Sequence, residues 1–436
     1  MRLSHEENEL LCRVEGEAPM GGIMRRHWLP VCMSEEVAQR DGAPVRSRLL
    51  GEDLVVFKDS NGRIGALGEF CLHRRASLFY GRNEECGLRC LYHGWKFDVE
   101  GRVVDMPSEA PGSVERLNRT TKSYPVREGG GFVWVWMGPK AEMREFEPPA
   151  WAPVPGIAHA IVKMHAACNW AQVLEGSIDS AHSSSLHSTE MPAGEVEGST
   201  ATGGSWVRPS TDRAPRLQFE ATSYGFRYAA IRKPIKNPQT HQYVRTTLFL
   251  APYTVLIPPN DQYKLSQMLV PIDDVNTMFY WVAWHPDPKK GIAQEAWRKF
   301  CAATVGEDLD RSFRKKRTAA NDYLQDRERM KRGDFTGITG IPTQDMAMWE
   351  SMGPITDRAE DNPGASDLAV AQFRRMMVAA AKAFRDGGAA IGTQKTQPYA
   401  SLASYEGVVP NTVDWRTLGA TEEPLAIAGS AARCPS

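Results

Sequence analysis

The sequence is poor in cysteine, has no excess of either charge, and contains no long apolar run. Eight cysteines among 436 residues are too few for a disulfide scaffold. The formal net charge of −1 provides no basic field that would attract nucleic acid. No stretch approaches the ~20 uninterrupted apolar residues of a membrane span, and the N-terminus carries charges where a signal peptide has its apolar core. These absences predict a reduced, cytoplasmic protein with neither a membrane nor a nucleic-acid partner.

The spacing of strand-like runs, turns and prolines predicts three parts. Residues 1–24 are expected to form a short helical segment. Residues 25–140 carry short apolar runs between glycine-bearing turns, a pattern typical of a small all-β domain. Residues 141–436 mix strand-like runs with helical stretches and begin in a linker rich in proline, at Pro148, Pro149, Pro153 and Pro155. The expected fold class is therefore α+β, with the all-β part first.

Two short motifs supply the first candidate metal site. Cys71 and His73 form C-x-H, and Cys90 and His93 form C-x-x-H after sixteen intervening residues. A Rieske [2Fe–2S] cluster has two thiolates on one iron and two imidazoles on the other, which raises its reduction potential. A structural zinc site would use the same residue types, but zinc fingers usually pair cysteine with cysteine and histidine with histidine. The mixed order, followed by glycine and tryptophan at positions 94–95, favours the [2Fe–2S] cluster.

A second metal site is predicted from Asp179, His182 and His187. Asp179 and His182 are three residues apart, which predicts that both project from one face of a helix. The serine run at 183–185 is expected to end that helix, so that the chain bends and both imidazoles converge. Two histidines and one carboxylate on one face of an iron(II) ion leave positions open for dioxygen and substrate. Each histidine taken alone could be a polar residue satisfied in the core.

The two motifs together resemble the Rieske non-haem iron aromatic-ring-hydroxylating oxygenases, and the stretches 49–106 and 341–355 resemble the phthalate dioxygenase branch. The resemblance implies an N-terminal all-β Rieske [2Fe–2S] domain at 25–140. It also implies an α+β helix-grip (START-like) catalytic domain at 141–436, with an antiparallel sheet. The third iron ligand would be Asp345, which follows Gln344 and could otherwise be a helix N-cap. One departure is Arg75, which stands where many relatives have glycine in C-P-H-R-G.

The resemblance also assigns a role to Asp179 and predicts an oligomer. In the family this carboxylate bridges an iron-ligating histidine, here His182, to a cluster histidine of a neighbouring subunit, here His93. A head-to-tail homotrimer or stacked hexamer would bring the cluster and the iron close enough for electron transfer. Glu175 is a weaker candidate for a supporting role. Electrons would come from a separate reductase that carries flavin and a [2Fe–2S] cluster.

Two arginines are the candidate substrate residues. Arg208 and Arg245 are both flanked by strand-like residues, and planar guanidinium groups are suited to carboxylates. An internal aspartate or glutamate partner is the competing explanation, and the resemblance favours substrate carboxylates. The expected reaction is cis-dihydroxylation of an aromatic acid, with phthalate at its 4,5-position as the best single guess. A monooxygenase or O-demethylase, a phenoxybenzoate-type diaryl-ether dioxygenase, and a Rieske electron-transfer protein remain alternatives.

Overall fold

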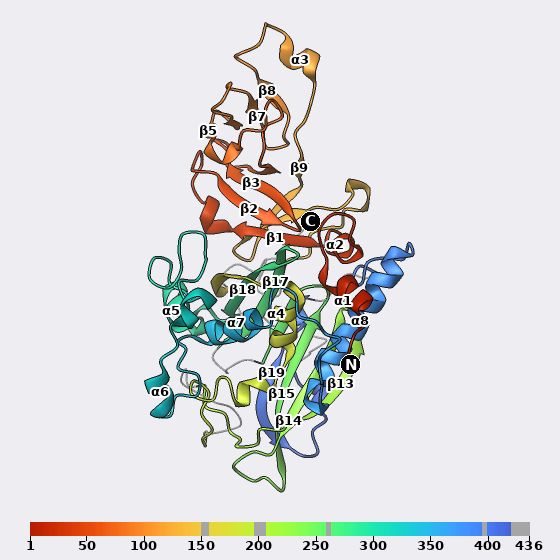
Figure 1. Ribbon diagram of the computed structural model, residues 1–436, viewed down its shortest axis with the longest axis vertical. Helices are drawn as coiled ribbons and strands as arrows, with labels where there is room; N and C mark the ends of the chain where they lie inside the picture. The colour runs from red at the N-terminus through yellow and green to blue at the C-terminus, as the bar shows by residue number, and fades with distance from the viewer. Residues whose placement is uncertain (150–156, 196–205, 259–262, 395–398, 420–436) are drawn as a thin grey trace, which may run out of the picture. The chain divides into compact units, whose positions relative to one another are not determined.

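The computed structural model describes residues 1–149, 157–195, 206–258, 263–394 and 399–419 (Figure 1). They fall into two compact units. One unit is Val14–Phe146, and the other joins Met1–Arg13 to the chain from Glu147 onward. The first thirteen residues belong with the C-terminal unit because helix α1 (His5–Cys12) packs against helices α8 and α4 of that unit. Pro153 and Pro155 of the expected linker lie outside the described residues.

The unit Val14–Phe146 is built from short antiparallel strands in three small sheets. Their orders are β1-β11-β10, β2-β3-β4-β9 and β5-β6-β7-β8. The elements are α2 (Pro19–Met24), β1 (Trp28–Met33), β2 (Val45–Leu49), β3 (Glu52–Lys58), β4 (Ile64–Gly68), β5 (Arg82–Glu84), β6 (Gly87–Arg89), β7 (Lys96–Phe97), β8 (Val103–Asp105), α3 (Ser113–Leu117), β9 (Ser123–Tyr124), β10 (Val126–Gly129) and β11 (Phe132–Trp136).

One apolar cluster ties the cysteines of the first motif to the core of this unit. Cys71 and Cys90 are buried together with Phe57, Leu88 and Phe97 from strands β3, β6 and β7. Strand β3 contributes the apolar run Leu-Val-Val-Phe, and β-branched and aromatic residues suit a pleated, buried surface. The two loops that carry the first motif are therefore anchored through their cysteines.

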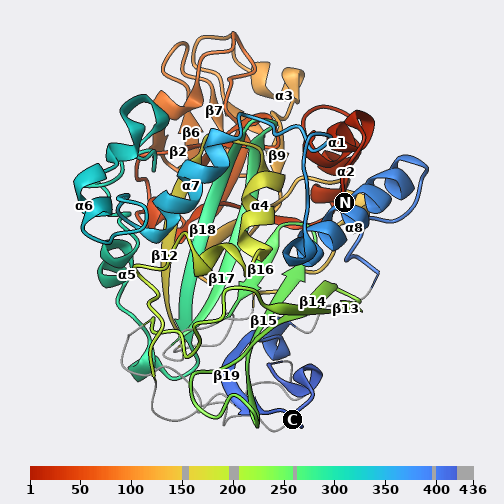
Figure 2. The same cartoon turned by 60° about the horizontal axis from the view of Figure 1, so that its bottom comes forward.

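The C-terminal unit is an eight-stranded antiparallel sheet with helices on one face. The strand order is β12-β18-β17-β16-β15-β14-β13, and β19 pairs with β15. Helices α4, α7 and α8 lie over the same face of the sheet (Figure 2). The elements are β12 (Ala158–Ala166), α4 (Trp170–Ile178), β13 (Arg216–Thr222), β14 (Gly225–Arg232), β15 (His241–Leu250), β16 (Thr254–Ile257), β17 (Lys264–Asp273), β18 (Asn276–His285), α5 (Gln294–Phe300), α6 (Arg327–Lys331), α7 (Ile341–Ser351), α8 (Leu368–Arg385) and β19 (Tyr405–Pro410).

Helix α4 is the element that positions the second metal site. Asn169 caps its N-terminus, where the side-chain oxygen accepts a hydrogen bond from the N–H of Ala171 at 3.0 Å. The helix packs against strands β15–β18 and against α7. Gly176 lies so close to Trp349 of α7 that a Cβ atom there would meet the indole nitrogen at 2.0 Å. This close approach brings the end of α4 next to the helix that carries Asp345.

The architecture confirms the expected fold class, an all-β unit followed by an α+β unit with an antiparallel sheet. Within the described ranges, none of the helices combines the length and apolar character needed to cross a membrane.

Candidate functional site

The four residues of the first motif lie on two similar loops. In one loop the N–H of Arg75 donates to the carbonyl of Cys71 at 3.0 Å, and in the other the N–H of Gly94 donates to the carbonyl of Cys90 at the same distance. Gly94 has φ +78° and Arg75 has φ +62°, so both turns use the left-handed region. Arg75 thus occupies, with a side chain, a backbone conformation that favours glycine, at a cost of roughly 1–2 kcal/mol.

The imidazoles of the two loops face each other. The ring centroids of His73 and His93 are 4.3 Å apart, and the indole of Trp95 stacks on His73 at 4.7 Å. The Nδ1 atom of His73 is buried and has no hydrogen-bond partner among the described residues. Buried polar atoms are normally paired, so an unpaired ring nitrogen beside a second imidazole is the arrangement expected of a metal ligand. The donor set therefore fits a [2Fe–2S] cluster.

The thiols of this site behave as buried groups. Burial, followed by the neighbouring Cys90, raises the pKa of Cys71 to about 11. Apolar side chains between the ligands are exposed by contrast, with Leu72 at 39%, Leu91 at 61% and Tyr92 at 56% exposure. The ligand loops thus present an apolar rim to solvent.

The structure corrects the prediction that Asp179 and His182 share a helix face. Helix α4 ends at Ile178, and Asp179 is its C-cap with φ −81° and ψ 115°. His182 opens a separate 3₁₀ turn, His182–Ser184. The Asp179 carboxylate accepts the N–H of Ala181 at 2.7 Å and forms a local Asx-type turn. This turn competes with the helix and ends it before His182. The spacing therefore predicted correctly that Asp179 and His182 lie together, but not how they do so.

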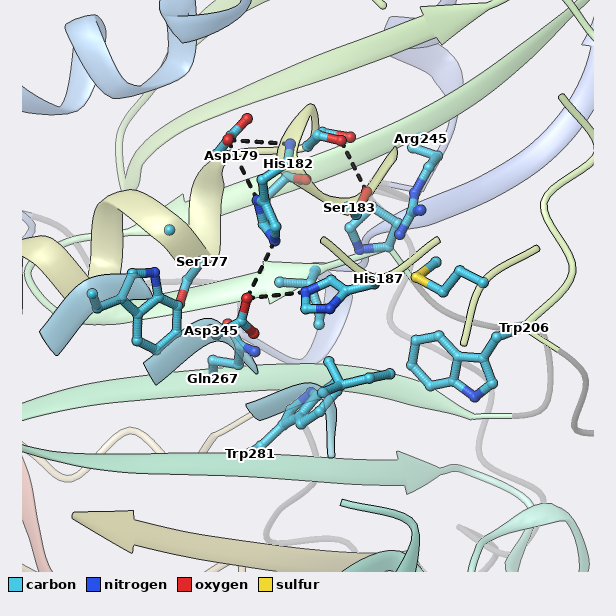
Figure 3. A pocket seen from close by; sticks show the side chains of 18 of the residues that line it. Ser177, Asp179, His182, Ser183, His187, Trp206, Arg245, Gln267, Trp281 and Asp345 are labelled. Carbon is cyan, nitrogen blue, oxygen red and sulfur yellow. Dashed lines mark hydrogen bonds and ion pairs between the residues drawn. The ribbon is translucent and has the colours of Figure 1, made fainter. Parts of the chain in front are cut away.

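His182, His187 and Asp345 converge from two distant segments (Figure 3). Their potential ligand atoms all lie within 4.8 Å of one another. The Nε2 atom of His187 is 3.0 Å from Asp345 Oδ1, and Nε2 of His182 is 3.5 Å from the same oxygen. The two imidazole nitrogens and one carboxylate oxygen therefore face a common point, which is the donor set of a 2-His-1-carboxylate iron site.

Gln344 fixes the orientation of His187, and we did not anticipate this role. Nδ1 of His187 lies 2.8 Å from Gln344 Oε1, and the amide nitrogen of Gln344 donates to Glu190 at 2.7 Å. With the proton on Nδ1, the lone pair of Nε2 points toward Asp345. The residue type before Asp345 was visible in the sequence, but only the fold shows what it contacts.

Asp179 and His182 form an electrostatic pair. His182 Nδ1 is 3.4 Å from Asp179 Oδ2, on the side of the ring opposite Asp345. Burial by itself would lower the pKa of His182, but the Asp179 and Asp345 carboxylates outweigh burial and raise that pKa. Burial would likewise raise the pKa of Asp179, and His182 with the backbone N–H groups of the turn lowers it instead. The carboxylate is therefore held ionised beside the imidazole.

The triad lies at the edge of an inner pocket. Aromatic walls come from Trp206 and Trp281, and Gln267 and Arg245 contribute polar groups (Figure 3). Gln267 and Trp281 are cross-strand partners on β17 and β18. The pocket can accept a flat, mostly apolar ring with a polar substituent, which is the usual composition of a small-molecule site.

A second hollow, the outer groove, lies on the other side of the same residues. Asp179, His182 and Asp345 line both hollows. The outer groove is also lined by the exposed apolar side chains Phe335, Met348 and Met352 and by Leu186. His182 thus lines both the inner pocket and the outer groove.

The two predicted substrate arginines have different surroundings. Arg245 lines the inner pocket, and its guanidinium is 3.8 Å from Glu406, its cross-strand partner on β19. Arg208 is buried but is not among the residues that line the pocket. Its nitrogens donate to Ser184 Oγ at 2.7 Å and Ser183 Oγ at 2.9 Å. The alternative of an internal carboxylate partner is thus partly realised at Arg245.

Glu175 lines the outer groove, but its hydrogen bonds go to two arginines and not to the triad histidines. Its carboxylate accepts hydrogen bonds from Arg358 at 2.7 Å and from Arg374 at 2.8 Å. The predicted supporting role at the iron is replaced by a buried ion cluster that holds α4 against α8. It is one turn of helix away from Asp179, which is why the sequence suggested it.

Comparisons with family models divide the chain in two. Residues 27–125 match the Rieske [2Fe–2S] domain, and residues 135–432 match the LigXa C-terminal domain like family.

Curated relatives extend over nearly the whole chain. The phthalate 4,5-dioxygenase oxygenase subunit of Pseudomonas putida is 56% identical, covering 95% of this chain and 94% of that protein. The 3-chlorobenzoate-3,4-dioxygenase oxygenase subunit of Comamonas testosteroni is 35% identical, covering 94% and 96%.

Solved structures show the same fold at lower identity. NdmA of Pseudomonas putida CBB5 with caffeine has a TM-score of 0.56 at 17% identity, covering 86% of this chain and 96% of that one. Dicamba monooxygenase bound to dicamba has a TM-score of 0.53 at 17% identity, covering 83% and 97%.

Proposed function

The chain belongs to the Rieske non-haem iron oxygenases with a LigXa-like C-terminal domain, and from this membership we propose that it is the oxygenase component of a phthalate 4,5-dioxygenase. It would convert the aromatic acid to a cis-dihydrodiol with dioxygen and electrons from a separate flavin and [2Fe–2S] reductase. The observation that carries the proposal is the position of Asp179, His182 and Asp345, which line both the inner pocket and the outer groove.

The proposed ligands follow from the two donor sets. Cys71, His73, Cys90 and His93 would hold the [2Fe–2S] cluster, and His182, His187 and Asp345 would hold the iron. When bound, the cluster supplies electrons singly and the iron activates dioxygen. Gln344 then keeps the Nε2 atom of His187 directed at the metal position.

Substrate carboxylates are assigned to the arginines. Arg245 lines the pocket, where its Nε and Nη1 atoms have no hydrogen-bond partner among the described residues. A carboxylate would satisfy these buried donors and offset the cost of burying the charge. Arg208 is the second proposed carboxylate residue, and its Nε atom has no hydrogen-bond partner among the described residues. The ring would lie against Trp206 and Trp281, which pack edge to face with their centroids 6.2 Å apart, with the carbons to be hydroxylated toward the triad.

We assign the electron bridge to Asp179 and the docking of a second copy of the chain to the outer groove. The Asp179 side chain retains 21% exposure beside His182. The apolar rim around His93, made of Leu72, Leu91 and Tyr92, is complementary in character to the apolar lining of the groove. Docking of this kind in a ring gives a homotrimer, and two stacked rings give a hexamer. The cytoplasmic location expected from the sequence stays a prediction.

Replacing Asp179 with Asn tests the bridge. Both metal centres should remain, because Asp179 is not among the proposed ligands, while turnover falls at least ~100-fold as the coupling through the carboxylate is lost. Metal content, the absorption spectrum of the cluster and product formation are measured together. Wild-type turnover in this variant would refute the bridge.

Product analysis separates the dioxygenase from the alternatives. A panel of phthalate, benzoate, methoxylated and phenoxy-substituted acids is supplied with a matched reductase. A cis-diol that retains both carboxylates supports the proposal, whereas release of formaldehyde or a phenol indicates demethylation or ether cleavage. About two iron atoms per chain instead of about three would leave only the electron-transfer protein.

A further inference from the structure

A closed ring of hydrogen bonds ties Arg208 to the turn that carries the bridge and the iron ligand. Arg208 donates to the hydroxyls of Ser183 and Ser184. Ser183 donates in turn to the carbonyl of Ser180 at 3.0 Å. Arg232, from strand β14, donates to that same carbonyl at 2.9 Å and to Ser184 Oγ at 3.4 Å, which closes the ring. The two serines and the carbonyl lie within the segment 179–184.

The ring is buried and carries an excess of positive charge. Arg232 is 2% exposed and Arg208 is 4% exposed. Burial first, and then the charges of Arg245 and Arg232, lower the pKa of Arg208 to about 10. Glu406 is the acidic group paired with this cluster within the described residues, and its distance to Arg245 is 3.8 Å. An anion that enters beside Arg208 would therefore offset part of this excess positive charge.

Two side chains of strand β14 bond to backbone carbonyls of the turn. Tyr228, also on β14, donates its hydroxyl to the carbonyl of Ile178 at the start of the turn. Arg232 donates to the carbonyl of Ser180, two residues further on, so it fixes a peptide group that lies between Asp179 and His182. Any shift of Ser183 or Ser184 is transmitted to Arg232 through bonds made to a rigid, planar guanidinium.

We propose that Arg232 is a positioning residue that couples occupancy of the carboxylate site to the Asp179–Ser184 turn. When a substrate carboxylate binds Arg208 Nε, which has no hydrogen-bond partner among the described residues, the other two nitrogens keep Ser183 and Ser184, and the anchored guanidinium holds the turn against Arg232 of β14. A dianionic ring acid, which engages both Arg208 and Arg245, would anchor Arg208 in this way, and a monocarboxylate held by Arg245 alone would not. The inference rests on the proposed function and adds to it a means by which substrate prepares the bridge.

Arg232→Met removes the coupling and retains the two proposed carboxylate residues. Backbone hydrogen exchange over residues 179–184 is measured in the holoenzyme, without electron donor, with and without phthalate. In the wild type we expect phthalate to slow exchange at least about fivefold, because the turn becomes ordered. In Arg232→Met the slowing should fall below about twofold, while the phthalate Kd changes by less than about threefold. Phthalate slowing of wild-type size in this variant would overturn the proposal.

Controls separate positioning from general destabilisation. Arg227→Met changes the same charge on the same strand but on the opposite face, where Arg227 pairs with Glu220. It should keep the full effect of phthalate. Ser184→Ala removes only the shared hydroxyl and should reduce the effect in the same direction, so the test survives if Arg232→Met does not fold. Arg232→Lys should restore the effect only in part, because Nη2 of Arg232, which serves both acceptors, is held by a planar guanidinium, whereas the lysine ammonium sits on a flexible stem.

Single-turnover kinetics give a second measurement. Oxidation of the pre-reduced cluster by dioxygen should be faster with phthalate than with benzoate in the wild type, and the ratio should approach one in Arg232→Met. A structural role alone would lower both rates equally and keep the ratio, which would overturn the coupling. Failure of the wild type to bind phthalate would refute the proposed substrate and the coupling together, whereas normal binding with an unchanged ratio refutes the coupling alone.

Discussion

The cluster loops and the iron triad draw their side chains from very different spans of sequence. The four cluster residues lie within positions 71–93, on two loops whose cysteines are part of the core of their own unit. The triad joins His182 and His187 to Asp345, which comes from helix α7 more than 150 positions later. The first site is thus specified locally, and the second depends on how α4 and α7 pack. The two sites should therefore fail in different ways.

Cys90→Ala should have the largest effect, because it removes a proposed cluster ligand and a core side chain at once. We expect turnover below about 1% of wild type and loss of the visible absorption of the cluster. The unit Val14–Phe146 should also melt at a lower temperature, since the metal would cross-link two loops of a small core. Cys86→Ala, on a half-exposed cysteine, is the control. An intact cluster in Cys90→Ala would contradict the assignment.

Asp345→Ala should abolish turnover to a similar extent but leave the fold intact. The variant loses a proposed iron ligand, and we expect iron to fall from about three to about two atoms per chain while the cluster absorption persists. Asp357→Ala, an exposed carboxylate of the same unit, should change neither value. If Asp345→Ala unfolded its unit as Cys90→Ala unfolds the other, the contrast between local and packed sites would be wrong.

Glu175→Gln should lower the free energy of unfolding more than it lowers turnover. It leaves Arg358 and Arg374 without their shared carboxylate, and breaking a buried ion cluster costs about 3–5 kcal/mol. Burial would raise the pKa of Glu175, but the two arginines lower it below the ordinary value. Its contribution is therefore complete above the unfolded-state pKa and is lost as pH falls through the lower folded-state pKa. Denaturant unfolding at several pH values checks both points, and a variant with the pH dependence of the wild type would contradict them.

Gln344→Leu should weaken the iron site without touching the metal. Loss of the hydrogen bond to His187 Nδ1 is expected to cost about 10–100-fold in iron affinity, as for other groups that orient a ligand. Iron retention against a graded chelator is the measurement. Gln344→Asn keeps the amide on a shorter side chain. Its iron retention should lie between those of the wild type and Gln344→Leu. Equal retention in wild type and Gln344→Leu would remove the orienting role.

Gly94→Ala should have the smallest effect and tests the local character of the cluster site. The residue has φ +78°, and a Cβ atom would meet Pro107 Cγ at 2.5 Å. We expect a loss of about 1–2 kcal/mol, seen as a lower temperature for bleaching of the cluster. Arg75→Gly, at the matching turn, should shift that temperature in the opposite direction by relieving the left-handed strain. Equal and unchanged melting in both variants would show that neither turn is strained.

The sequence was sufficient for the locally encoded parts of this molecule. The C-x-H and C-x-x-H motifs supplied the four proposed cluster ligands, and the strand-like and helical patterns predicted an all-β part followed by an α+β part, as the structure has them. Asp345 could be assigned only through the resemblance, because nothing near it in the sequence marks a metal. The rest depends on tertiary packing, which local pattern does not contain.

Three features show where sequence reasoning reached its limit. Asp179 was placed on a helix because its spacing to His182 suits one, whereas an Asx turn ends the helix first. Glu175 was linked to the iron by proximity in sequence, but its carboxylate turns toward Arg358. Trp206, Trp281 and Gln267 line the pocket from three separate segments, and no periodicity signals which core residues face a cavity.

The C-terminal strand has a consequence for engineering and for divergence within the family. β19 returns along the part of β15 that the short β16 leaves unpaired, and there it sets Glu406 opposite Arg245. Part of the counter-charge of the inner pocket is therefore encoded about 160 positions beyond the arginine, by a residue outside the pocket wall. Exchanging this tail between relatives would retune the preference for substrate charge while every pocket-lining side chain stayed the same. A tail swap is thus a modular route to new acid substrates.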